Sequence, residues 1–183
     1  TKNDVYILAS SGTGAMEAAV VNLLSWGDKA LVIEGGKFGE RWTELCEAYG
    51  IEPIVVKVEW GKALDPEVLK ATLGKEKAIK VVFATLCETS TGVTMDIKAL
   101  AEVVRDTDVV LAVDAISGLG ALDLAMDDWG VDVVVCGSQK GLMLPPGLGF
   151  ISVSKKAWKR VEESKCPKYY FDIKEARKAL EKT

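Results

Sequence analysis

Residues 109–114 read Val-Val-Leu-Ala-Val-Asp, a short apolar run that ends on an acid. Nearly continuous apolar runs of this length, rich in β-branched residues, are typical of strands covered on both faces. Such strands belong to sheets with helices packed on each side. The run at Val109–Val113 therefore predicts a buried strand of an α/β fold, with the chain leaving the sheet at Asp114.

Further runs of this kind recur along the chain, and stretches of helical periodicity lie between most of them. We expect strands at Val5–Ala9, Ala30–Ile33, Pro53–Val58, Ile79–Ala84, Val131–Cys136 and Leu148–Val153, and helices at Thr13–Leu24, Gly39–Tyr49, Pro66–Leu73, Ile97–Arg105 and Lys155–Glu163. This alternation implies right-handed crossovers and a three-layer α/β/α fold with a mainly parallel sheet of about seven strands. The last strand follows the turn Pro145-Pro146-Gly147 instead of a helix, which leaves an antiparallel direction open for it.

The chain of 183 residues is long enough for one domain with a full core, which we place at residues 1–168. Residues 169–183 are charged, with a short helical pattern over 173–180, and indicate the start of a connection to a further domain. The first predicted strand begins almost at residue 1, so both ends resemble cut points.

Composition argues against several classes of function. The net charge of −4 provides no basic surface for nucleic acid, and no apolar run approaches the roughly 18 residues that span a bilayer. The N-terminal residues do not resemble a signal peptide. We therefore expect a cytoplasmic protein that binds neither nucleic acid nor membrane.

The chain has no histidine, which argues against zinc sites, haem sites and Ser-His or Cys-His nucleophiles. The four cysteines (Cys46, Cys87, Cys136 and Cys166) form no CxxC pair, and we interpret them as reduced, mostly buried packing residues. We expect no metal site. Any chemistry must use lysine, a carboxylate, a hydroxyl or a bound cofactor.

Polar, small or ionisable residues follow four of the predicted strands. These stretches are Ser10–Gly14, Glu88–Gly92, Asp114–Ser117 and Gly137–Lys140. In open parallel sheets, ligands bind outside the carboxyl ends of the strands. The four stretches therefore predict one ligand site on a single rim.

Ser11-Gly12-Thr13-Gly14 is a candidate phosphate cradle, because glycines let the backbone approach an anion at a helix N-terminus. A plain strand-to-helix turn is the simpler interpretation. A third is an NAD-binding site, with Gly12-x-Gly14 as its first glycines and Glu34 as the ribose-binding acid. Glu17 occupies the position of its third glycine, where a side chain obstructs close packing.

Three other residues each allow two interpretations. Asp114 is either a turn residue or a carboxylate partner for a cationic ring nitrogen, as pyridoxal phosphate (PLP) requires. Lys140 is either a surface lysine or a nucleophile for an aldehyde. Phe38, between glycines after a strand, is either a core residue or a platform for a flat cofactor ring.

Taken together, the motifs resemble those of the class V aminotransferases of the fold-type I PLP superfamily, particularly the alanine–glyoxylate and serine–glyoxylate (serine–pyruvate) branch. The resemblance covers nearly the whole chain, but only the family's large domain. The stretches that carry it are Ser11-Gly12-Thr13-Gly14-Ala15-Met16-Glu17-Ala18, Glu88-Thr89-Ser90-Thr91-Gly92, Val113-Asp114-Ala115-Ile116-Ser117 and Gly137-Ser138-Gln139-Lys140-Gly141.

The resemblance implies a role for each matching residue. Lys140 would form the Schiff base with PLP and move the substrate proton, and Asp114 would pair with the ring nitrogen. Phe38 would stack on the ring, Ile116 would pack on its other face, and Thr89 would bond the ring hydroxyl. The backbone of Gly12, Thr13 and Gly14, with the Gln139 side chain, would hold the phosphate.

The resemblance also implies a homodimer that moves an amino group from a small amino acid, such as alanine or serine, to glyoxylate or another 2-oxo acid. In the family, an arginine of a C-terminal small domain grips the substrate carboxylate, and the neighbouring subunit completes the phosphate site. We therefore expect a truncated large domain. Cysteine desulfurases place histidines at the ring, which this chain lacks. An NAD-binding oxidoreductase domain and a non-catalytic scaffold remain the alternatives.

Overall fold

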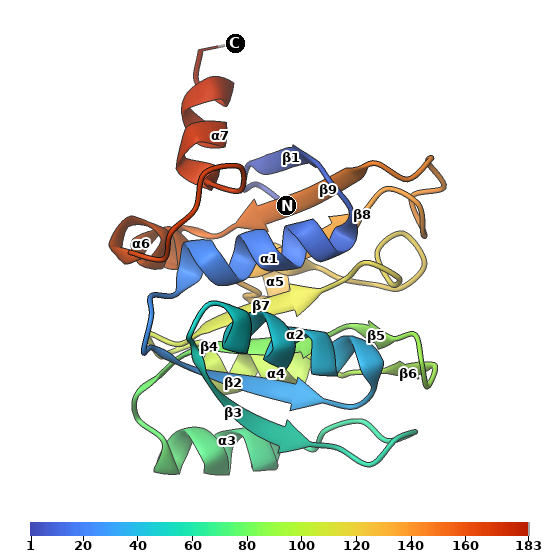
Figure 1. Ribbon diagram of the computed structural model, residues 1–183. Helices are drawn as coiled ribbons and strands as arrows, with labels where there is room; N and C mark the ends of the chain where they lie inside the picture. The colour runs from blue at the N-terminus through green and yellow to red at the C-terminus, as the bar shows by residue number, and fades with distance from the viewer. Residues whose placement is uncertain (183) are drawn as a thin grey trace.

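The computed structural model describes residues 1–182, which form a seven-stranded sheet flanked by helices (Figure 1). In spatial order the strands are β1 (Val5–Ala9), β9 (Leu148–Val153), β8 (Val133–Gly137), β7 (Val110–Asp114), β4 (Ile79–Thr85), β2 (Lys29–Glu34) and β3 (Glu52–Lys57). β9 alone runs antiparallel to its neighbours in this sheet, and the parallel pairs include β7 with β4 and β8. The three-layer α/β fold with a mainly parallel sheet is thus confirmed, and β9 takes the antiparallel direction.

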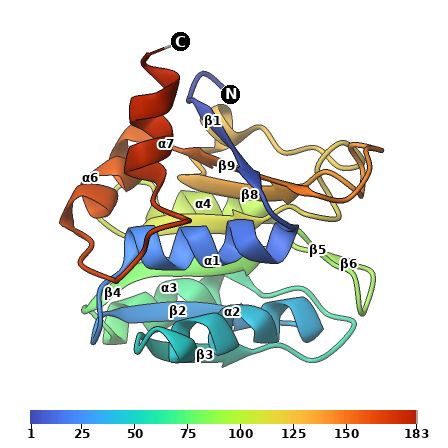
Figure 2. The same ribbon diagram turned by 45° about the horizontal axis from the view of Figure 1, so that its top comes forward.

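Helices cover both faces of the sheet (Figure 2). One face packs against α1 (Gly12–Leu23), α2 (Lys37–Ala48), α6 (Lys155–Glu163) and the N-terminal end of α7 (Ile173–Leu180); the other packs against α3 (Pro66–Lys75), α4 (Ile97–Val104) and the short α5 (Met126–Trp129). Each face has its own cluster of buried apolar side chains. Strands β4, β7 and β8 contribute buried side chains to both clusters, which holds their carboxyl ends in place.

Helix capping follows the sequence closely. The Asp65 carboxylate accepts a hydrogen bond from the Glu67 amide, and Asp96 does the same for Ala99 at the start of α4. Both bonds satisfy amides that have no intrahelical acceptor. The helix predicted to end at Leu73 is longer in the structure, because α3 continues through Gly74 to Lys75.

Strand β1 departs from the expectation of coverage on both faces. Tyr6 and Leu8 are buried beneath the helices, but Val5 and Ile7 on the opposite face are exposed. The run is continuously apolar, yet β1 lies at the edge of the sheet, where a helix packs on one face only. Two elements were also absent from the predicted set, α5 and a hairpin of β5 (Cys87–Glu88) and β6 (Val93–Thr94).

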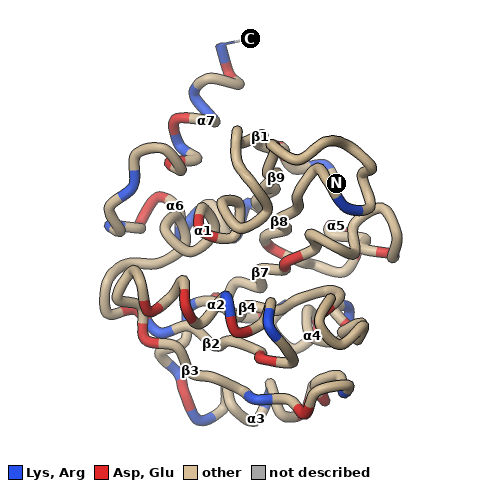
Figure 3. Tube along the Cα trace, turned by 45° about the vertical axis from the view of Figure 1, so that its right-hand side comes forward, with Lys and Arg blue, Asp and Glu red and all other residues tan. Residues whose placement is uncertain are grey.

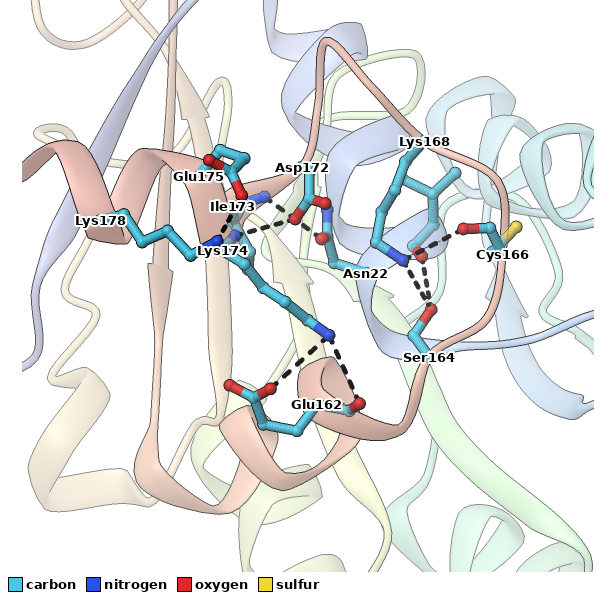
Figure 4. A network of polar contacts seen from close by, with 11 residues as sticks. Asn22, Glu162, Ser164, Cys166, Lys168, Asp172, Ile173, Lys174, Glu175 and Lys178 are labelled. Atoms are coloured by element: carbon cyan, nitrogen blue, oxygen red, sulfur yellow. Dashed lines mark hydrogen bonds and ion pairs between the residues drawn. The ribbon is translucent and has the colours of Figure 1, made fainter.

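The segment after α6 returns to the domain. Buried Asn22 donates to the carbonyls of Ala18 and Phe171, and its side-chain oxygen accepts from the Ile173 amide at 3.3 Å. Lys168 donates to Ser164 Oγ and to the Cys166 carbonyl (Figure 4). Ile173 is fully buried, so the chain at Phe171–Ile173 packs against α1, and the assignment of residues 169–183 as a connection stays a prediction.

Acidic and basic positions are interspersed along α2 and α7 (Figure 3). Among residues 1–182, none of the helices combines the length and hydrophobicity that a bilayer crossing requires. Cys46, Cys136 and Cys166 are buried and Cys87 is half-buried, all four without a disulfide.

Candidate functional site

The turns that follow β1, β7 and β8 meet at one end of the sheet. A Cβ atom placed on Gly12 would lie 2.5 Å from Cδ1 of Ile116, and one on Gly137 would lie 3.4 Å from Cα of Gly12. The first distance is too short for any side chain at position 12, and the second is barely long enough for one at position 137. Glycine at position 12 therefore lets three strand ends converge, as the sequence predicted for this rim.

The first turn of α1 leaves its amides open. Gly12, Thr13 and Gly14 form this turn, and the Ser11 side chain caps none of its N–H groups. The first amides of a helix have no intrahelical acceptor, and the helix dipole makes this end attractive to an anion. The structure thus places these residues where a phosphate can bind to backbone N–H groups.

Gln139 lies beside this turn. Its Oε1 atom is 3.0 Å from a Cβ placed on Gly137, and it is buried without a hydrogen-bond partner in the described residues. A buried amide with an unpaired end costs free energy unless a ligand satisfies it. The orphaned amide therefore fits a ligand with hydrogen-bonding groups at this place.

Asp114 is only 3% exposed at the end of β7. Its Oδ1 accepts from the Ile116 amide at 2.8 Å, while Oδ2 has no hydrogen-bond partner within residues 1–182. The pKa of Asp114 is raised to about 6, mainly by burial and in smaller part by the nearby Glu88 charge, while the Ile116 amide and Arg41 oppose the shift. A cationic group at Oδ2 would stabilise the ionised form.

Phe38 is held in place through its backbone. The carboxylate of Glu88, 1% exposed, accepts from the amides of Phe38 and Gly39 at 3.1 and 2.9 Å. The same carboxylate accepts from the amide and the hydroxyl of Ser90. One acid thus caps α2 and fixes the turn that contains Thr89.

A guanidinium group joins α2 to α1. Arg41 donates from Nη1 to the Thr13 hydroxyl at 3.2 Å, and its Cζ lies 4.9 Å from the centroid of the Phe38 ring. Phe38 and Thr13, from two predicted parts of the site, thus both contact the Arg41 side chain.

Lys140 lies in the turn between β8 and β9. It is exposed, and its side chain forms no hydrogen bond or ion pair with a described residue. The neighbouring Gly141 packs tightly on the chain at Leu119, because an added Cβ would meet the Leu119 carbonyl oxygen at 2.2 Å. Thr89 is likewise exposed. Both side chains are free to contact a ligand.

Sequence reasoning assigned no role to Glu88 or Arg41. Glu88 stood within a quoted motif, and Arg41 lies one helical turn after Phe38, a spacing that places both on one face of a helix. That spacing was the available signal for Arg41. The contacts of Glu88 depend on how the turn after β4 meets α2, which no local pattern encodes.

Comparisons with known proteins agree with this geometry. The family model "Aminotransferase class-V" matches residues 1–172. The chain is 48% identical to the soluble hydrogenase 42 kDa subunit of Anabaena cylindrica, covering 100% of this chain and 48% of that protein. It is 41% identical to L-aspartate–glyoxylate aminotransferase of Paracoccus denitrificans, covering 96% of this chain and 45% of that protein.

The crystal structure of an alanine–glyoxylate aminotransferase from Nostoc superposes with a TM-score of 0.93 at 29% identity. It covers 97% of this chain and 48% of the Nostoc chain. The chain thus spans about half the length of the proteins it matches. These matches favour the interpretation based on Lys140 and Asp114 over an NAD site. Glu17 occupies the position of the third glycine of an NAD motif, and in the structure its carboxylate accepts a hydrogen bond from Tyr49.

Proposed function

The chain belongs to the class V aminotransferase family, and from this premise we propose that it is the PLP-binding part of an aminotransferase. The observation that carries the proposal is that an electropositive helix N-terminus and a buried carboxylate lie in one site. The open amides of α1 suit a phosphate, and the buried carboxylate of Asp114 suits a ring nitrogen.

The remaining site residues take their proposed places between these ends. Phe38 and Ile116 supply apolar surface for the two faces of a flat ring, and Thr89 supplies a hydroxyl for the ring oxygen. Lys140 is the proposed covalent attachment point and the base that moves the substrate proton. When bound, PLP supplies the electron sink for amino-group transfer.

The proposed reaction moves an amino group from a small amino acid, such as alanine or serine, to glyoxylate or another 2-oxo acid. The names of the relatives from Paracoccus and Nostoc support glyoxylate as acceptor. The Anabaena relative is named as a hydrogenase subunit. Residues 1–182 contain no group of three or more His, Cys, Asp or Glu side chains that could hold a metal.

We further propose that residues 1–168 form the PLP-binding domain and that 169–183 lead toward a small domain. A homodimer and a cytoplasmic location complete the proposal. The homodimer is supported by the dimeric active sites that the sequence resemblance implies for the family.

Borohydride reduction of the purified chain with PLP tests the proposal. We expect intact mass to increase by one reduced cofactor and peptide mapping to place it on Lys140. Lys140→Ala should remove the adduct, because Lys37, a second lysine at this end of the sheet, pairs with Glu40 at 2.6 Å, whereas the Lys140 side chain has no partner among the described residues. Lys62→Ala, which removes an exposed loop lysine elsewhere, is the matched control and should leave the yield unchanged. An adduct that persists in the Lys140 variant would refute the site.

A further inference from the structure

The proposed roles leave Arg41 unexplained. This side chain is half-buried between α1 and α2, yet it forms no ion pair with a carboxylate of residues 1–182. Its one hydrogen bond goes to the Thr13 hydroxyl, and its plane lies near the Phe38 ring. The guanidinium charge also lowers the pKa of Asp114, so Arg41 lies near both the proposed phosphate end and the proposed ring-nitrogen end of the site.

The bond to Thr13 has a defined direction. A guanidinium can only donate, so the Thr13 oxygen must act as the acceptor. The hydroxyl proton is then left to point elsewhere, and no described residue accepts it. Thr13 is the second residue of α1, beside the open amides of the first turn. The hydroxyl is therefore arranged to donate to an anion at the helix N-terminus.

We propose that Arg41 is a positioning residue of the phosphate site, which orients the Thr13 hydroxyl as a donor to the phosphate of PLP. The inference rests on the proposed function and adds to it a side-chain donor and its orienting group. Arg41 acts through Thr13, and its contact with Phe38 keeps the guanidinium in place. Arg41 and Thr13 should therefore strengthen the binding of a phosphorylated cofactor and have little effect on the binding of one without a phosphate.

Pyridoxal, which lacks the phosphate, separates this role from support of the ring. Dissociation constants for PLP and for pyridoxal are measured by absorbance titration on wild type, Arg41→Lys, Thr13→Val and the double variant. We expect each single change to weaken PLP binding about tenfold, as for loss of a charge-assisted hydrogen bond. The double variant should lose no more than about twice either single loss, because both changes remove one unit.

Pyridoxal affinity should change less than about twofold in all three variants. Thr13→Ser keeps the hydroxyl and should bind PLP nearly as well as wild type. Arg177→Lys is the control, since that guanidinium lies 4.6 Å from the Trp158 ring, a comparable contact outside the site. Thermal melting of each variant verifies that it folds.

Equal losses for PLP and pyridoxal would show that Arg41 acts on the ring through Phe38, and would overturn the proposal. Additive losses in the double variant, or unchanged PLP affinity, would overturn it as well. If wild type forms no adduct with either compound, the proposed function itself fails and the inference falls with it. If wild type binds PLP and only the variants behave otherwise, the inference alone is wrong.

Discussion

Asp114 combines two demands that oppose each other. At 3% exposure the ionised carboxylate has little water to stabilise it, which is the main reason that its pKa is raised to about 6. The same burial strengthens its attraction for a cationic ring nitrogen, because few waters screen the charge. The residue that suits the cofactor is therefore one that destabilises the empty protein near neutral pH.

The stability consequence has a definite sign. Between about pH 4, the unfolded pKa, and pH 6, the folded state holds more protons on Asp114 than the unfolded state. Unfolding free energy should therefore fall as pH rises through this window. We expect Asp114→Asn, which cannot ionise, to raise the unfolding free energy at pH 7 by about 2–3 kcal/mol, with the difference vanishing below about pH 4.

Denaturant titrations of the cofactor-free protein at pH 4 and pH 7 measure this difference. PLP affinity of the same variant should fall at least about tenfold, because a charge-assisted bond to the ring is lost. A variant that is less stable at pH 7 would contradict the assignment of a costly buried charge. Unchanged PLP affinity would contradict the pairing with the ring nitrogen.

At the scale of elements, Glu88 connects the hairpin β5–β6 to α2. Its carboxylate accepts from the amides of Phe38, Gly39 and Ser90, so two elements share one acceptor. Glu88→Gln keeps the shape but replaces one acceptor oxygen by an NH₂ donor facing backbone donors. We expect the unfolding free energy to fall by about 1.5–3 kcal/mol, the range for hydrogen bonds to a charged group.

Chemical denaturation of Glu88→Gln beside Glu163→Gln, an exposed acid at the end of α6, measures that loss. Amide hydrogen exchange should also quicken at Phe38 and Gly39 in the Glu88 variant. Unchanged stability and exchange would mean that the carboxylate is not the cap of α2.

The elements show which features a sequence can predict. Apolar runs located all seven strands of the main sheet, because this signal is local. The rim residues were predicted from strand ends and from resemblance, and their roles stay predictions. The contacts of Glu88 and Arg41 were not predicted, since their partners at Phe38 and Thr13 come from other elements, and only tertiary packing decides which side chains meet there.

On the scale of the whole molecule, one face of the edge strand β1 leaves apolar side chains exposed. Val5 and Ile7 are 46% and 64% exposed, and Leu148 on the paired strand β9 is 38% exposed. Contiguous exposed apolar surface on an edge strand favours association with other chains. This surface, defined by these three residues, should make the chain self-associate.

Ile7→Lys should reduce that association and leave the fold intact, because the side chain points away from the helices. Sedimentation velocity over a range of concentrations gives the test, with circular dichroism to verify folding. Val68→Lys, at an apolar position of similar exposure on α3, is the control. If wild type stays monomeric at high concentration, or if both variants behave alike, β1 is not the associating surface.

The pairing of β1 with β9 also has a consequence for the order of events on the ribosome. Val5 pairs with Ser152, and Gly12 meets Ile116 and Gly137, so the first-made residues of the rim wait for partners synthesised much later. Contacts this distant along the chain form slowly, because a long loop must close first. The turn at Gly12–Gly14, which we propose binds the phosphate, therefore takes its final shape only after β9 has emerged from the exit tunnel, and cofactor capture during translation would report that β9 has been inserted.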